Sequence, residues 1–224
     1  MASPGRDNTR RRSRQDSTRR ILDAAAGVFA ADGPKAATID AICAKAGLNK
    51  RMVYHYFGSK CGLYEAVLRG VYEEFFSLEV SLGSMLLPAE ELLETLVRRY
   101  YTFLAAHPRF VRLIGHENLN DGRAARRLKL TGQKAPVITA LELALRKGQA
   151  EGRFRPGVDA TQLLISIFSL CFFYFSNRHT MEQLLGRSSM APSRMPQRIG
   201  HVVDLLLHGI AAEGPEARPR EKAK

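Results

Sequence analysis

Residues 38–60 read TIDAICAKAGLNKRMVYHYFGSK, and this stretch decides the fold at the N-terminal end of the chain. Thr38 is a favourable N-cap, and Asp40 lies where a helix dipole prefers an acidic side chain. Gly47 suits the position just after a helix, because glycine adopts the left-handed backbone conformation at no steric cost. A short helix is therefore predicted over residues 39–46.

A second short helix follows at once. Asn49 is its predicted N-cap, and Leu48 and Val53 have the spacing of the two partners in a hydrophobic staple. The helix is predicted to run to about Tyr56 and to end at the glycine that comes soon after. Two short helices joined by a tight turn that contains glycine predict a helix-turn-helix, with a helix over residues 17–31 packed across both.

Cations and aromatic rings share this second helix. Lys50 and Arg51 occupy its first turn, and Lys60 lies in the first turn of the next helix. A helix N-terminus favours acidic side chains by about 0.3–1 kcal/mol each, so three cations there are unfavourable in the protein alone. Either these side chains extend into water, or phosphates bind there, held by cations and helix N-terminal amides together. We favour phosphates, because a tyrosine hydroxyl can donate to a phosphate while its ring packs on the sugar.

The charge of the whole chain also indicates an anionic partner. The 224 residues carry a net charge of +12 and a pI of about 10.0, which is typical of binding to nucleic acid or to an anionic membrane surface. Residues 1–70 hold nine Arg and four Lys against five Asp and one Glu, which is more than half of the excess. The Arg-rich residues 1–16 are predicted to be a disordered arm, which either keeps the protein soluble or touches DNA.

Several classes of protein are excluded. Three widely spaced cysteines without a CxxC argue against a disulfide scaffold or a zinc site and fit the cytoplasm. The first 20 residues contain no apolar stretch, so no signal peptide is expected. The longest apolar run, residues 163–175, is shorter than the ~20 residues that a membrane span requires. His116-Glu117 begins a HExxH-like string whose fifth residue is Asn120, so the zinc-protease motif fails. No enzyme, cofactor or metal site is predicted.

Apolar residues recur at helical spacing through the rest of the chain, and no stretch shows sustained strand alternation. A helix capped by Asp159 and running to about Arg178 is apolar nearly all round, so it must be covered on every side. Residues 186–196 are predicted to be a loop rich in Gly, Ser and Pro. Two apolar stripes mark further helices: Leu92, Leu96, Tyr100 and Phe103, and Ile199, Val203, Leu206 and Ile210.

The N-terminal segment resembles the signature of the TetR family of bacterial transcriptional regulators. The resemblance covers about residues 17–68. Beyond it, the match rests on length, helical pattern, the HPRF string at 107–110 and the FYFSNRHT string at 173–180. One departure is Cys61-Gly62 in place of the usual acidic pair, since Gly62 costs ~1 kcal/mol inside a helix. The matching positions are Thr38, Ile42, Ala46 to Asn49, Tyr54 to Lys60, and Leu63.

The resemblance implies an all-α fold of about nine helices. A helix-turn-helix domain at residues 17–63 would precede a larger domain at 64–212 that binds an effector and dimerises, and a charged tail would follow at 213–224. It also implies a cytoplasmic homodimer that binds a palindromic double-stranded DNA operator. The implied function is a ligand-responsive, sequence-specific regulator, most simply a repressor released by a small organic effector.

The resemblance and the residue pattern together assign three candidate sites. The DNA contacts are predicted at Arg19, Thr38, Asn49, Lys50, Arg51, Met52, Tyr54, His55, Tyr56 and Lys60. Polar residues within apolar helices predict a ligand pocket lined by Tyr100, Phe103, His107, Phe110, His116, Glu117, Asn118, Phe172, Tyr174, Asn177 and Arg178. A dimer interface is predicted at Phe168, Phe175, Ile199, Val203, Leu206 and Ile210, although packing within one chain would also explain these apolar residues.

Two other functions compete with an effector-controlled regulator. The chain could be an architectural or effector-independent dimeric DNA-binding protein, in which the larger domain only dimerises. It could also be a helical enzyme or carrier with a basic arm for membranes, but no catalytic constellation supports this. A metabolite that lowers DNA affinity would separate the first alternative from a ligand-responsive regulator.

Overall fold

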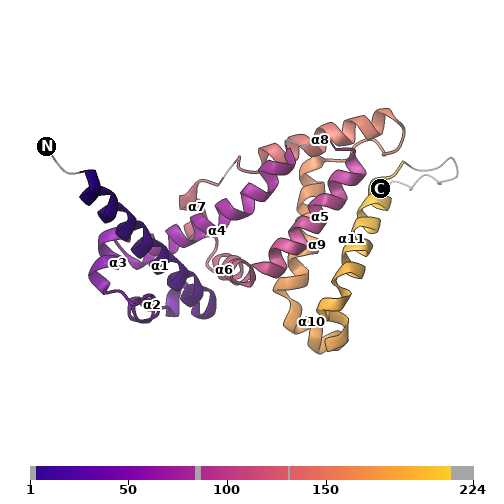
Figure 1. Cartoon of the computed structure of the whole chain (residues 1–224). Helices are drawn as coiled ribbons and strands as arrows, with labels where there is room; N and C mark the ends of the chain where they lie inside the picture. The colour runs from indigo at the N-terminus through magenta and orange to yellow at the C-terminus, as the bar shows by residue number, and fades with distance from the viewer. Residues whose placement is uncertain (1–3, 84–86, 131, 213–224) are drawn as a thin grey trace. The chain divides into compact units, whose positions relative to one another are not determined.

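The computed structural model describes residues 4–83, 87–130 and 132–212, so the predicted charged tail from residue 213 lies outside these ranges. The described residues are almost entirely helical, with one isolated bridge between Phe154 and Ala211, which confirms the all-α prediction. They form eleven α-helices rather than about nine, because short helices follow residues 122 and 177 (Figure 1). The helices are α1 Pro4–Ala36, α2 Ile39–Ala46, α3 Lys50–Phe57, α4 Lys60–Gly83, α5 Ala89–Ala106, α6 Pro108–Leu119, α7 Arg123–Leu128, α8 Ala135–Ala150, α9 Ala160–Ser176, α10 Arg178–Leu185 and α11 Met195–Ile210.

The chain divides into two compact units. Unit 1 comprises residues 1–75 and 107–131, and unit 2 comprises residues 76–106 and 132–224. The division differs from the boundary predicted at residue 63, because α6 packs against α1 and therefore belongs with the N-terminal helices. The first part of α4 also lies in unit 1, where Leu63 and Leu68 are fully buried.

Unit 1 has its own apolar core. The helix α1 begins at Pro4, well before the predicted start at residue 17, and it kinks at Gly33, whose φ of 75° and ψ of 164° are not helical. α1 packs against α2 and α6. Its apolar face joins those of the next helices in one cluster, with fully buried side chains at Ile21, Ala25, Phe29, Ile42, Val53, Leu63, Leu68 and Leu113.

Unit 2 is built around α5. This helix packs against α8, α9 and α11, and Figure 1 shows α5, α9 and α11 running alongside one another. The stripe predicted from Leu92 to Phe103 is buried, as expected. The short helix α10 and two 3-10 turns, Arg187–Met190 and Pro192–Arg194, connect α9 to α11. No single helix in the described ranges is long and apolar enough to cross a membrane; only the bent pair α9 and α10 passes by length and composition together.

Gly62 in α4 is a required glycine rather than a weak point in the helix. A β-carbon at this position would lie 2.2 Å from the carbonyl oxygen of Phe57. The Gly62 amide also donates to Ser59 Oγ, at 3.0 Å, so the start of α4 is held close to the end of α3. The substitution Gly62→Ala is therefore expected to destabilise the protein by about 1–3 kcal/mol, as overpacking does, although helix propensity alone favours alanine.

Gly70 in the same helix provides the matched control, because a β-carbon there would meet nothing within 4 Å. Gly70→Ala is expected to stabilise the protein by about 0.5–1 kcal/mol. Thermal unfolding of both variants measures the difference, since 1 kcal/mol corresponds to roughly 2–4 °C for a chain of this size. Equal melting temperatures for the two variants would contradict the close approach at Gly62.

Candidate DNA-binding site

The helix-turn-helix is fixed by its caps, as the sequence predicted. Thr38 Oγ1 accepts from the amide of Ala41 at 3.1 Å, and Asn49 Oδ1 accepts from the amide of Met52 at 3.0 Å. Gly47 ends α2 in the left-handed conformation, with φ of 64° and ψ of 36°. These local bonds set where each helix begins and ends.

Two basic side chains of unit 1 hydrogen-bond to backbone carbonyls next to the helix-turn-helix. Arg20 on α1 donates to the carbonyl of Ala46 at 2.8 Å, at the C-terminal end of α2. Lys60 donates to the carbonyls of Lys35 and Ala37, at 3.1 and 2.9 Å. The role of Arg20 was not predicted from the sequence, and Lys60 was predicted to contact a phosphate. Two of the three Lys60 donors instead bind the protein at the end of α1.

The eight residues of α3 divide into two faces. Val53 is fully buried, and Met52, Tyr56 and Phe57 are partly buried against the unit 1 core. The other face consists of the exposed residues Lys50, Arg51, Tyr54 and His55. Met52 and Tyr56 were predicted as DNA contacts, but the structure turns both toward the core.

The exposed cations differ in what they already bind. Lys50 forms an ion pair of 2.6 Å with Asp40, and this hydrogen bond raises the pKa of the Lys50 ammonium. Arg19 pairs with Asp16 at 3.0 Å. Within the part of the chain that the structure describes, Arg51 has no ion-pair partner. The Arg14 guanidinium lies 5.6 Å from the ring centroid of Tyr56, so the α1 extension meets the back of α3.

Comparison with known families agrees with this geometry. Residues 21–67 match the model described as bacterial regulatory proteins, tetR family. Residues 88–206, more than half of the chain, match the tetracyclin repressor-like C-terminal domain. The chain belongs to the TetR family. This TetR family member is accordingly a DNA-binding transcriptional regulator.

Relatives of this regulator agree along most of its length. The HTH-type transcriptional repressor NicS of Pseudomonas putida is 35% identical over 202 residues, which span 89% of this chain and 95% of that protein. The HTH-type transcriptional repressor SCO4008 of Streptomyces coelicolor is 30% identical over 67% of this chain and 74% of that protein. A TetR family regulator from Marinobacter aquaeolei VT8 has the same fold, with a TM-score of 0.64 over 91% of this chain and 100% of that chain at 17% identity.

The predicted ligand-pocket residues fall in different units. Five of them lie in unit 1, where Glu117 is 2% exposed and accepts from the amides of Ala124 and Ala125, at 2.7 and 2.9 Å. Glu117 therefore caps α7. The others in unit 1 are His107, which pairs with Glu74 at 2.9 Å, the buried Phe110, His116 and the exposed Asn118.

The other six predicted pocket residues lie in unit 2. Tyr100, Phe103 and Tyr174 are buried, with Tyr174 9% exposed. Phe172 and Asn177 are half-buried, and the exposed Arg178 pairs with Glu182 at 2.7 Å. Of the six, Tyr174 lines a groove of the described structure.

The predicted dimer residues also lie within unit 2. Ile199, Leu206 and Ile210 are buried in their own chain, and Phe168, Phe175 and Val203 are half-buried. The outward faces of α9 and α11 instead carry Ile165, Phe173 and Leu205, each about half exposed at 50–52%.

Unit 2 contains a buried charged cluster that was not predicted from the sequence. Glu79 of α4 is 1% exposed, and its Oε1 accepts from Lys134 Nζ and from the hydroxyl of Tyr100. The Lys134 ammonium lies 5.2 to 5.9 Å from the ring centroids of Phe76, Tyr100 and Phe168. Burial raises the pKa of Tyr100, and the Glu79 carboxylate raises it further.

Proposed function

We propose that this TetR family protein is a cytoplasmic repressor that leaves a palindromic operator when a small organic effector binds. The observation that carries this proposal is the outward face of α3, where Arg51, Tyr54 and His55 are exposed beside two capped helix starts. A cation without an ion-pair partner on such a face can bind guanine O6 and N7, which is the commonest specific base contact.

The contacts divide by chemistry. Arg51 and His55 read base edges in the major groove, while Tyr54 and Lys50 bind phosphates. Thr38 also binds a phosphate, because its oxygen accepts the capping bond and its hydroxyl proton is left to donate. Arg19 and Asn49 border this DNA-binding surface. Lys60 contributes positive charge while it hydrogen-bonds to the carbonyls at the end of α1.

A homodimer completes the DNA site. One helix-turn-helix covers too short a half-site for tight binding, and two recognition helices about 34–36 Å apart read a palindrome. We place the dimer interface on the outward faces of α9 and α11. Ile165 and Leu205 provide apolar contact area there, and the predicted Ile199, Leu206 and Ile210 support the same helices from behind.

Two relatives along most of the chain are named repressors, which supports repression rather than activation. The effector would act by differential binding. A ligand that prefers a conformation of unit 2 incompatible with the operator spacing lowers DNA affinity by the ratio of its affinities for the two states.

Selection of binding sites from genomic DNA with the purified full-length protein tests this function. The expected result is a set of inverted repeats with two equal half-sites. A single unrepeated half-site would contradict the dimeric mode. A selection that enriches DNA by shape, without a sequence motif, would instead support an architectural DNA-binding protein.

A further inference from the structure

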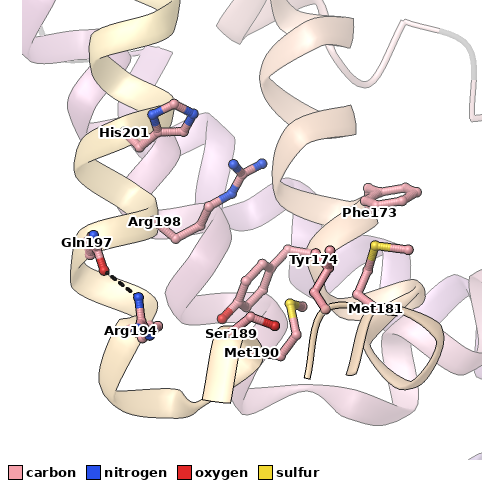
Figure 2. Close-up of a pocket in the computed structure, with 10 residues that line it drawn as sticks. Phe173, Tyr174, Met181, Ser189, Met190, Arg194, Gln197, Arg198 and His201 are labelled. Atoms are coloured by element: carbon pink, nitrogen blue, oxygen red, sulfur yellow. Dashed lines mark hydrogen bonds between the residues drawn. The ribbon is translucent and has the colours of Figure 1, made fainter. Parts of the chain in front are cut away.

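A groove of about 510 Å³ opens within unit 2, between α9, α10, the turn Arg187–Met190 and α11 (Figure 2). Its volume lies in the range of sites that bind small molecules, about 300–1,000 Å³. The residues that form it lie on α9, on α11 and on the segment between them, which contains the short α10 that the sequence pattern did not predict.

One side of the groove is apolar. Phe173 of α9, Met181 and Leu185 of α10, and Met190 of the following turn line it. Leu185 is 65% exposed and Phe173 is 50% exposed, so apolar surface remains uncovered in the single chain. Methionine side chains adapt to irregular shapes, so this wall can accept either a flexible acyl chain or a flat ring.

The opposite side is cationic. Arg194, Arg198 and His201 line it, and no Asp or Glu is among the residues that form the groove. The acidic side chains that flank it are already bound, since Glu182 pairs with Arg178 at 2.7 Å and Asp204 with His208 at 3.2 Å. Neither Arg194 nor Arg198 forms an ion pair within the described ranges.

Arg198 is held in place for a ligand. Its Nε donates to the hydroxyl of Tyr101 at 3.2 Å, and that hydroxyl donates to the carbonyl of Leu170 at 3.3 Å. Burial raises the pKa of Tyr101 to about 12, so the hydroxyl stays protonated and keeps this arrangement. The two terminal nitrogens of Arg198 have no hydrogen-bond partner in the described part of the chain, and they form the forked end that suits a carboxylate.

A buried hydroxyl in the same groove also lacks a partner. Tyr174 of α9 is 9% exposed, and its hydroxyl makes no hydrogen bond to the described residues. Figure 2 shows the Tyr174 and Arg198 side chains extending from different helices, with the Tyr174 hydroxyl directed toward Ser189 and the Arg198 guanidinium directed away from that hydroxyl. A buried donor without a partner is costly, and a polar atom of a bound molecule would satisfy it.

We propose that this groove binds a small organic anion, a carboxylate carried on an apolar acyl or aromatic body. The carboxylate accepts from the forked end of Arg198, and Arg194 adds positive charge. The apolar body packs against Phe173 and the methionines. That such binding also releases the operator rests on the proposed function, whereas the binding itself does not.

Calorimetric titration of the full-length protein without DNA tests the site. Decanoate and 1-naphthoate are the probes, and decanol and 1-naphthylmethanol are their neutral counterparts. At least one carboxylate is expected to bind about tenfold or more tightly than its alcohol, and the better probe distinguishes an acyl from an aromatic body. Arg198→Gln is expected to weaken carboxylate binding by about 10- to 100-fold, because bonds to a charged group are lost.

Matched variants keep the test specific. Arg146→Gln removes an exposed arginine of α8 that pairs with Glu142, and it is expected to leave binding unchanged. Arg194→Gln removes the second positive charge of the groove and is expected to weaken binding by about 2- to 10-fold, which retains a test should Arg198→Gln unfold. Operator binding with and without the carboxylate is measured separately, so a failure of regulation is distinct from a failure of the site.

Three results would overturn the proposal. The first is no saturable binding of either carboxylate, and the second is equal binding of carboxylate and alcohol. The third is unchanged carboxylate binding in Arg198→Gln and Arg194→Gln together with a changed dimer dissociation constant in sedimentation. That last result would show that a second copy of the chain fills the groove.

Discussion

The variant Arg51→Ala is expected to bind the operator at least about 30-fold more weakly than the natural protein, because each arginine–guanine pair contributes ~1–3 kcal/mol and a dimer loses two. Arg51 is exposed on α3 and has no ion-pair partner in the described residues. It therefore reaches DNA without breaking a bond, whereas Lys50 must first leave Asp40. The loss should appear as relaxed base preference at one position of each half-site.

Fluorescence anisotropy with the selected operator and with random DNA, at one salt concentration, measures this effect. Random DNA should be affected much less, because nonspecific affinity comes from phosphates. Tyr54→Phe serves as a contrast, with the same fractional loss expected on both DNAs. Arg123→Ala removes an exposed arginine of α7 that pairs with Asp121, and it controls for net charge. Equal losses on operator and random DNA for Arg51→Ala would show that Arg51 binds a phosphate.

The helix boundaries of the DNA-binding site could be predicted, because the bonds and the glycine conformation that set them are local. The caps Thr38 and Asn49 bond to amides three residues away, and Gly47 adopts its conformation whatever surrounds it. Hydrophobic spacing likewise located the buried stripe of α5, because an amphipathic helix has one way to face a core.

Which residues of α3 face the core and which face outward could not be predicted from the sequence. In a helix of eight residues, the core-facing side depends on how the helix docks on α1 and α2, and docking turned Met52 and Tyr56 inward. Lys60 differs from its prediction because its partners are carbonyls 23 and 25 residues earlier in the chain. Only tertiary contact brings such groups together.

The candidate ligand residues show the same limit more strongly. Glu117 is a polar residue in an apolar helix, which is the pattern expected of a pocket residue, yet its partners are the amides at the start of α7. Arg198 passed unnoticed because the pattern of a single helix does not reveal that Tyr101 of α5 orients it. Sequence spacing identified the helices that carry these groups but not their partners.

The second large effect is expected at the buried pair of Glu79 and Lys134. Glu79→Ala is expected to destabilise the protein by about 3–5 kcal/mol, because it leaves the Lys134 ammonium without its ion-pair partner in largely apolar surroundings. The Lys134 side chain is one-third exposed and surrounded by aromatic rings, and desolvation lowers the pKa of its ammonium. Thermal unfolding should show a decrease of roughly 6–20 °C.

A double-mutant cycle built from the single variants Glu79→Leu and Lys134→Met separates loss of the pair from loss of packing. Lys134→Met should also destabilise the protein, because the buried Glu79 carboxylate then loses its ion-pair partner. Its Oε1 would keep only the bond from the Tyr100 hydroxyl, and its Oε2 has no hydrogen-bond partner in the described residues. The double variant, Glu79→Leu with Lys134→Met, is expected to recover most of the stability, because an apolar pair of similar volume carries no desolvation cost. If each single variant costs less than ~1 kcal/mol, water reaches the carboxylate and the pair is not buried in solution. If the loss of unfolding free energy in the double variant equals the sum of the losses in the two single variants, the two charges are energetically independent. The aromatic rings alone would then hold Lys134 beside α9.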